Sequence, residues 1–218
     1  MKTRQFVVNP FQMNCFIYYD EDSKEGIIID PGTYTKEEES IVRNFIDENK
    51  ITIKNIINTH GHIDHILGNK FAKDTFNVPM LIHKDDLFLV NNSLEQSKMF
   101  GIEMSKPPDF DEFITEDTEI NIGNTKINFI HTPGHSPGSV CIVDHKNKNI
   151  FCGDLIFKNS VGRTDLPMGS FEILLDSINN KLFGKCSDNY NLYPGHMEPT
   201  TIIDEKNNNP FINNPNFH

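Results

Sequence analysis

The chain has 218 residues, of which 20 are lysine or arginine and 31 are aspartate or glutamate, giving a formal net charge of −11 at pH 7. A nucleic-acid partner is not expected, because binding to phosphates needs a concentrated basic surface and no basic run interrupts this acidity. The length predicts a single domain over residues 1–218 with a substantial buried core.

The cysteines and the amino-terminal residues indicate the cellular compartment in which the protein is expected. The four cysteines form no Cys-x-x-Cys pair, which predicts free thiols in a reducing environment. The opening residues, "MKTRQFVVNPFQMNCF", contain no long apolar region with a cleavage site, and no segment approaches 18 continuous apolar residues. We therefore expect a soluble, cytoplasmic protein with no membrane partner.

Short apolar runs separated by turn signals occupy the start of the chain and predict strands. These runs are residues 5–8, 15–19 and 26–30. Residues 35–50 come next, with Thr35 as a candidate N-cap and apolar residues at helical spacing, which predicts the first helix. A buried strand over residues 53–58 then leads into a histidine cluster, and residues 64–76 resume a helical pattern with Ile66, Leu67 and Phe71 on one face.

The second half of the sequence shows a similar but less regular alternation of predicted strands and helices. Residues 84–118 are polar and predict a helix followed by a long loop that could serve as a lid. Further strands are expected within residues 126–144, 149–157 and 189–196, a helix over residues 170–183, and an asparagine-rich tail from residue 205. The pattern predicts an α/β fold in which two sheet-plus-helix halves pack face to face as α/β/β/α layers.

The stretch "INTHGHIDHILGN" places four metal-ligating residue types within six positions: His60, His62, Asp64 and His65. In an extended loop, residues two apart share a side, so His60 and His62 can face one ion while Asp64 and His65 face a second. A lone histidine is usually a surface or hydrogen-bonded residue. Four ligand types directly after a buried strand instead indicate a metal site.

Distant parts of the chain offer the remaining ligands, because catalytic metal sites draw on several segments and keep a position open. The candidates are His135 in "HTPGHSPGS", Asp154 in "FCGDLIF" and His196 in "YPGHMEP". A carboxylate among apolar neighbours, as at Asp154, is costly to bury unless it is paired or binds metal. Each of the three is ambiguous alone, since spacing does not decide between a ligand and a structural residue.

The other histidines are expected to lie outside the metal site. His131 ends a strand and is read either as a strand-end residue or as a partner of a ligand. His83 is expected at a strand terminus and His145 in a turn, and His218 is terminal. None of these last three should bind the catalytic metal.

Five motifs occur in order: "THGHIDH", "HTPGHSPGS", "GDLIF", "VGRTDLP" and "YPGH". Together they resemble the metallo-β-lactamase superfamily, specifically its single-domain glyoxalase-II-like hydrolases, over nearly the whole chain. The resemblance implies the metallo-β-lactamase fold, a four-layer α/β/β/α sandwich. It also implies two divalent metal ions, with zinc as the first choice and iron or manganese as alternatives.

The same resemblance assigns the ligands. One ion is held by His60, His62 and His135, the other by Asp64, His65 and His196, and Asp154 bridges them. Two cations lower the pKa of a bridging water, and the resulting hydroxide attacks the substrate carbonyl. Asp64 is also the candidate catalytic residue, because it can orient that hydroxide or collect its proton. Arg163 is the candidate substrate contact, with pairing to Asp165 as its competing role.

The implied activity is metal-dependent hydrolysis of thioesters of the S-lactoylglutathione type, or of related small acyl esters. Two features depart from classical glyoxalase II enzymes. The chain ends soon after His196, without the helical domain that grips glutathione, and "GHMEPTT" replaces a GHGP-like run, so Met197 and Glu198 alter the rim of the site. The alternative is a mononuclear iron persulfide (sulfur) dioxygenase, with its iron at His60, His135 and Asp154.

Other classes fit the sequence less well. Class B β-lactamases tend to carry arginine where this chain has His65, and they are exported. Nucleic-acid-processing relatives carry an inserted domain and a basic surface. A purely structural metal site would be closed and usually rich in sulfur. The expected partner is a small-molecule thioester, and the sequence leaves the oligomeric state open.

Overall fold

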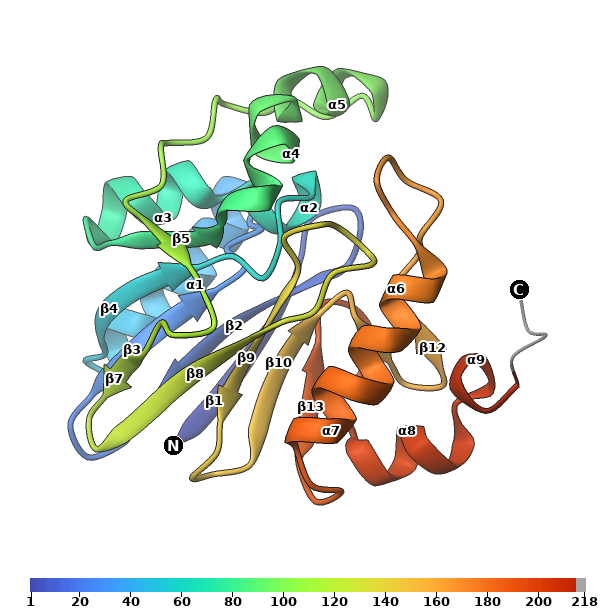
Figure 1. Cartoon of the computed structure of the whole chain (residues 1–218). Coiled ribbons are helices and arrows are strands. Elements are labelled where there is room, and N and C mark those ends of the chain that lie inside the picture. The colour runs from blue at the N-terminus through green and yellow to red at the C-terminus, as the bar shows by residue number, and fades with distance from the viewer. Residues whose placement is uncertain (215–218) are drawn as a thin grey trace. The chain divides into compact units, whose positions relative to one another are not determined.

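The computed structural model describes residues 1–214, which divide into two compact units. The first unit comprises Met1–Ile114 and Asn121–Thr125, and the second comprises Thr115–Ile120 and the residues from Lys126 onward. A mixed sheet flanked by helices forms the basis of each unit, so the predicted α/β class is confirmed (Figure 1). The single domain over residues 1–218 stays a prediction.

The sheet of the first unit has the strand order β1-β2-β3-β4-β5-β6. Its strands are β1 (Lys2–Val8), β2 (Met13–Tyr19), β3 (Glu25–Ile29), β4 (Thr52–Ile57), β5 (Met80–His83) and β6 (Glu112–Ile114). The first three strands are antiparallel neighbours, whereas β3, β4, β5 and β6 run parallel. Because parallel strands end at the same edge, Asp30 after β3 and His60 after β4 are brought to one edge of this sheet.

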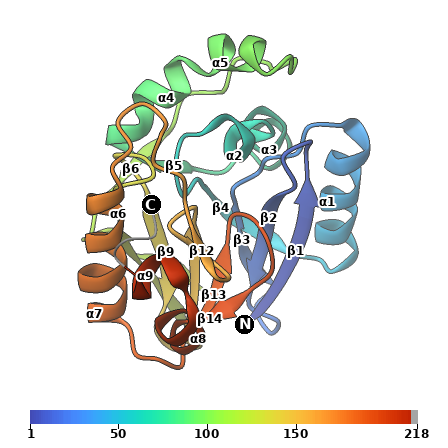
Figure 2. The same ribbon diagram turned by 90° about the vertical axis from the view of Figure 1, so that its right-hand side faces the viewer.

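Helix α1 (Lys36–Glu48) begins at the predicted cap. Glu38 N donates to Thr35 Oγ1 over 3.2 Å and Thr35 N donates to the Glu38 carboxylate over 3.1 Å, a capping box. Val42 and Ile46 of α1 are buried in the core cluster of this unit. Figure 2 shows α1 lying beside β1, β2 and β3. The local sequence signals therefore predicted this helix correctly.

The predicted helix over residues 64–76 is divided into α2 (Ile63–Ile66) and α3 (Asn69–Phe76). Gly68 N donates to Pro31 O over 2.8 Å, which ties the break to the turn that follows β3. Of the three residues predicted on one face, Ile66 is fully buried, and Leu67 and Phe71 are half-buried. The helical conformation was predicted correctly from the periodicity, but the turn between the two helices was not predicted.

Residues 84–118 form a short 3-10 helix (Lys84–Asp86), α4 (Leu87–Asn91) and α5 (Ser93–Met99), followed by a loop. The predicted helix and loop are confirmed in outline. Strand β6 was missed because it is three residues long with two of them exposed, which leaves no apolar alternation to detect. The role of this segment as a lid stays a prediction.

The second sheet has the order β14-β13-β10-β9-β8-β7. Its strands are β7 (Ile120–Ile122), which crosses the unit boundary, β8 (Thr125–His131), β9 (Val140–Asp144), β10 (Asn149–Gly153), β13 (Asn191–Pro194) and β14 (Thr200–Thr201). A separate hairpin consists of β11 (Ile156–Phe157) and β12 (Ser160–Val161). All predicted strands of this half are present.

The second unit has helices in one segment that was predicted to be helical and in a second segment where no helix was predicted. The segment over residues 170–183 is helical, as α6 (Phe171–Asp176), a π-helical turn (Ser177–Leu182) and α7 (Phe183–Lys185). Helix α8 (Ile202–Asn208) extends into the asparagine-rich tail and α9 (Pro210–Asn213) lies within it; Thr201 and Asn209 cap the two helices. Asparagine is a weak helix former, so the composition of this segment did not predict helices. Caps and contacts with the core stabilise them. His218 lies outside the described residues.

Among residues 1–214, no helix combines the length and the apolar character needed to cross a bilayer.

All four cysteines are free thiols, as predicted, and all four are buried. Burial raises the pKa of Cys141 to about 12 and that of Cys186 to about 11. Because only the thiolate is nucleophilic, we expect the native protein to react slowly with a disulfide reagent at pH 8, and four thiols to react promptly in denaturant. Rapid modification of any thiol in the native protein, timed by absorbance, would contradict this expectation.

Candidate metal centre

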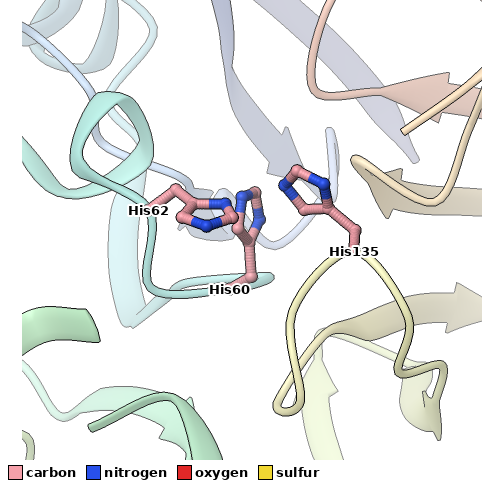
Figure 3. Close-up of side chains that lie close together, drawn as sticks. All are labelled: His60, His62 and His135. Carbon is pink, nitrogen blue, oxygen red and sulfur yellow. The ribbon is translucent and has the colours of Figure 1, made fainter. Parts of the chain in front are cut away.

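In the first unit, His60 and His62 lie in the loop from β4 to α2, and Asp64 and His65 lie in α2 itself. His60 and His65 are at most 1% exposed and His62 is 8% exposed. The ring centroids of His60 and His62 are 4.9 Å apart, and those of His60 and His65 are 4.0 Å apart. Figure 3 shows the His60 and His62 rings side by side. His65 Nε2 lies 3.8 Å from Asp64 Oδ2, so the loop and the short helix after it bring together the four residues that the sequence singled out there.

A buried carboxylate behind the loop orients two of these rings. Asp30 is 1% exposed and accepts hydrogen bonds from Thr59 N and Thr59 Oγ1, each over 2.7 Å. Its Oδ2 is 2.9 Å from His65 Nδ1, and Thr59 Oγ1 is 3.1 Å from His60 Nδ1. Since Nδ1 of both rings faces this carboxylate or its hydroxyl partner, Nε2 is the nitrogen that each ring can offer to a metal.

Sequence reasoning missed the role of Asp30. The available signal was a carboxylate directly after an apolar strand, "GIIID", which is the same signal that singled out Asp154 in "FCGDLIF". Strand β3 pairs with β4, which delivers the histidine loop, and that neighbour relation cannot be read from spacing. Asp30 is therefore a positioning residue that becomes visible only with the sheet order.

Replacing Asp30 with alanine should weaken metal binding by about 10- to 100-fold, because it removes the carboxylate that lies 2.9 Å from His65 Nδ1 and leaves both Thr59 donors without their acceptor. A chelator competition titration measures this effect, and circular dichroism checks that the variant is folded. Asp74→Ala, which removes an exposed carboxylate paired with Lys70 in the same unit, is the matched control. Equal affinities in the two variants would show that Asp30 does not position the ligands.

The backbone of the loop is fixed from the other side by Asp86. Gly61 N donates to Asp86 Oδ2 over 2.8 Å, and Asp86 is fully buried. A Cβ at position 61 would lie 2.9 Å from Asp86 O. Only glycine, at this position between His60 and His62, therefore allows the backbone to approach Asp86 so closely.

The second unit brings together the other three predicted ligands. β8, β10 and β13 run in the same direction, since β10 is parallel to β13 and antiparallel to β9, which is antiparallel to β8. His135, Asp154 and His196 follow the carboxyl ends of these strands and therefore reach one edge of the sheet. Figure 3 shows His135 at the end of its loop. Nε2 of His135 and Nε2 of His196 each lie 3.6 Å from the same oxygen, Asp154 Oδ2.

That spacing fits metal ligation. A separation of 3.6 Å is too long for a hydrogen bond. Two ligand atoms about 2.0–2.2 Å from one ion in a tetrahedral arrangement are themselves about 3.3–3.6 Å apart. The Asp154 side chain is 10% exposed, and a carboxylate so deeply buried is suited to a cation. The donor set of the second unit is therefore compatible with a carboxylate oxygen shared between ions.

Arg163 acts on this cluster through its backbone. His135 Nδ1 donates to Arg163 O over 2.8 Å, which leaves Nε2 as the metal-facing nitrogen. The Arg163 guanidinium makes two bonds of 2.7 Å with the Asp165 carboxylate, and this pairing lowers the pKa of Asp165 to about 2. The pairing of Arg163 with Asp165, which the sequence suggested as an alternative to substrate contact, is thus present. The substrate contact stays a prediction.

The remaining described histidines lie where the sequence placed them. His83 is the last residue of β5, and His145 lies in an exposed turn and is 2.8 Å from Tyr190 Oη. His131 ends β8, with Nε2 2.8 Å from Pro137 O. That none of His83, His145 and His218 binds the catalytic metal stays a prediction.

Comparison with known proteins identifies a matching family and similar proteins. Residues 8–196 match the family model of the Metallo-beta-lactamase superfamily. Hydroxyacylglutathione hydrolase GloC of Haemophilus influenzae is 35% identical over 213 residues, which cover 94% of this chain and 95% of the relative. The crystal structure of BLEG-1 B3 metallo-beta-lactamase has a TM-score of 0.88 at 32% identity and covers 97% of this chain and 100% of its own.

A second solved structure bears on the metal. TTHA1623 in a di-iron-bound form has a TM-score of 0.84 at 27% identity, with 95% of this chain and 99% of that chain covered. The resemblance and the metallo-β-lactamase fold inferred from the five motifs are thereby confirmed. The histidine and aspartate clusters are those of a metallo-hydrolase that uses divalent metal. The chain belongs to the metallo-β-lactamase superfamily.

Proposed function

We propose that this protein hydrolyses small acyl thioesters of the S-lactoylglutathione type. The observation that carries the hydrolytic chemistry is the approach of His135 and His196 to one oxygen of Asp154, each over 3.6 Å. The thioester class is supported by the 35% identity to a protein named hydroxyacylglutathione hydrolase, over nearly the full length of both chains.

The clusters of the two units together would supply seven ligands for two divalent ions. In this assignment one ion has His60, His62 and His135, the other has Asp64, His65 and His196, and Asp154 is shared. Zinc is our first choice, and iron is the leading alternative, since a similar protein has been solved in a di-iron-bound form. When bound, such a pair of ions supplies a hydroxide nucleophile at neutral pH and polarises the substrate carbonyl.

The side chains of this protein contribute orientation and proton transfer. Asp30 and the Arg163 carbonyl hold the Nδ1 side of three ligand rings, directly or through Thr59. The Asp64 side chain, 15% exposed, is the proposed acceptor for the proton that the nucleophile releases. The leaving thiolate needs no strong general acid, because a thiol is already far more acidic than an alcohol.

Arg163 is the proposed contact for an anionic group of the substrate. Its pair with Asp165 is exposed, at 61% and 69% of the two side chains, and exposed ion pairs are weak enough for an incoming carboxylate to compete. A small-molecule substrate and a cytoplasmic location belong to this proposal, and the four free cysteines agree with a reducing compartment.

The test is metal content per chain by elemental analysis, followed by S-lactoylglutathione hydrolysis. Nearly two metals per chain with turnover would support the proposal. One iron per chain, no hydrolysis, and oxygen uptake with glutathione persulfide would establish the dioxygenase alternative instead. A β-lactam belongs in the same assay because of the likeness to BLEG-1, and β-lactam turnover without thioester turnover would overturn the proposal.

The ligand assignment predicts distinct behaviour for three histidine variants. His62→Ala and His196→Ala should each lower metal content by up to one ion per chain and abolish most turnover. His145→Ala, in the exposed turn that contacts Tyr190, should change neither quantity. Elemental analysis and initial rates check this prediction, and equal losses in all three variants would show that the ligand set is wrong.

A further inference from the structure

An ion pair lies beside two candidate ligands of the second unit. Lys158 is four residues after Asp154, and Glu198 is two residues after His196. Lys158 Nζ and Glu198 Oε1 are 2.6 Å apart, and the two side chains are 45% and 68% exposed. Phe157, directly before Lys158, contacts the His196 ring edge-to-face with centroids 6.0 Å apart. The pair is therefore a charged group at the rim of the His196 side of the site.

The two halves of the pair are anchored to one buried carboxylate. Glu205 is 1% exposed, and its Oε2 accepts a hydrogen bond of 2.9 Å from Asn159 N, next to Lys158. Its Oε1 accepts a hydrogen bond of 2.6 Å from Thr200 Oγ1, two residues after Glu198. The chain segments that carry the two charges are thus joined through one buried carboxylate.

Both charges remain available to a ligand. An exposed ion pair is held weakly, so groups of a bound molecule can compete with either partner. Lys158 Nζ donates a hydrogen bond to Glu198, which raises the pKa of Lys158 and favours its ammonium form. Adjacent positive and negative charges complement the carboxylate and ammonium of an α-amino acid. A carrier bearing only phosphates or carboxylates would meet repulsion from Glu198.

We propose that Lys158 and Glu198 bind the zwitterionic α-amino-acid end of the thiol carrier, with its carboxylate on Lys158 and its ammonium on Glu198. This inference rests on the proposed thioesterase function and narrows its substrates to thioesters of peptide-like thiols with a free amino-acid terminus.

Two probes that differ in one charge test the pair. S-methylglutathione, which cannot be hydrolysed, and its N-acetyl derivative, which lacks the ammonium, are titrated by calorimetry into the metal-loaded protein. The corresponding S-lactoyl compounds are assayed in parallel. We expect Glu198→Gln to weaken binding of the ammonium-bearing probe about two- to fivefold and to strengthen binding of the N-acetyl probe. Lys158→Gln should weaken binding of both probes, and in each variant the change should appear in KM more than in kcat.

The matched controls are Glu116→Gln and Lys185→Gln. That pair belongs to the same unit, has a 2.7 Å separation and similar exposure, and is on neither ligand loop. Identical responses of the two probes to Glu198→Gln, or equal effects from the control pair, would overturn the inference. Discrimination between the probes without hydrolysis of either thioester would support the pair while refuting the proposed function.

Discussion

Asp154→Ala is expected to abolish turnover and to lower metal affinity by about a hundredfold or more, the largest effect of any single ligand change. In the proposed assignment this residue is shared by both ions, so its loss removes a ligand from each and leaves their charges less screened from one another. The approach of His135 and His196 to one oxygen of this side chain is the structural basis. Elemental analysis and rates at saturating substrate measure both effects.

The control for Asp154→Ala is Asp165→Ala in the same unit, which removes an exposed carboxylate paired with Arg163. It should retain full metal content. If Asp154→Ala kept two metals per chain, or lost no more than His62→Ala, the sharing of this carboxylate between two ions would be refuted.

Gly162→Ala is expected to eliminate most activity although position 162 supplies no ligand. A Cβ there would lie 1.8 Å from Asp154 O and 3.3 Å from His135 Nδ1. The first contact is with backbone, which cannot rotate away, so the segment carrying Arg163 must shift. That shift removes the Arg163 carbonyl from His135 Nδ1, a bond of 2.8 Å that selects the ring nitrogen facing the metal.

The expected signature of Gly162→Ala is a loss of metal affinity of about 10- to 100-fold together with a lower melting temperature, since overpacking also strains the fold. Chelator competition and thermal unfolding measure the two effects. Gly184→Ala in α7 is the control, because its nearest foreign atom would be 4.0 Å away. A Gly162→Ala protein with unchanged metal affinity would show that the loop tolerates displacement.

Local signals in the sequence predicted local structure well. Thr35 as the cap of α1 and the four ligand types from His60 to His65 depend only on neighbours in the chain, and both can be read directly. The break between α2 and α3 was not predicted, because it depends on a bond from Gly68 to Pro31, which is distant in sequence. Helix α8 was hidden by its asparagines, since its stability comes from tertiary contacts.

The grouping of distant residues required knowledge of which strands are neighbours. His135, Asp154 and His196 follow three strands, and nothing in their spacing says that these strands end at one edge of one sheet. The five motifs supplied that information by resemblance. Asp30 was missed because it belongs to none of those motifs and becomes meaningful only when β3 is known to pair with β4.

The hydrogen bonds of Asp30 also bear on how this protein acquires its metal. They join only protein groups, so they can form without a bound ion. We therefore expect one metal to be exchangeable for another without unfolding of the first-unit ligand loop. The metal found after purification would then reflect the supply in the growth medium, and reconstitution with a single defined ion is the way to assign an activity to it.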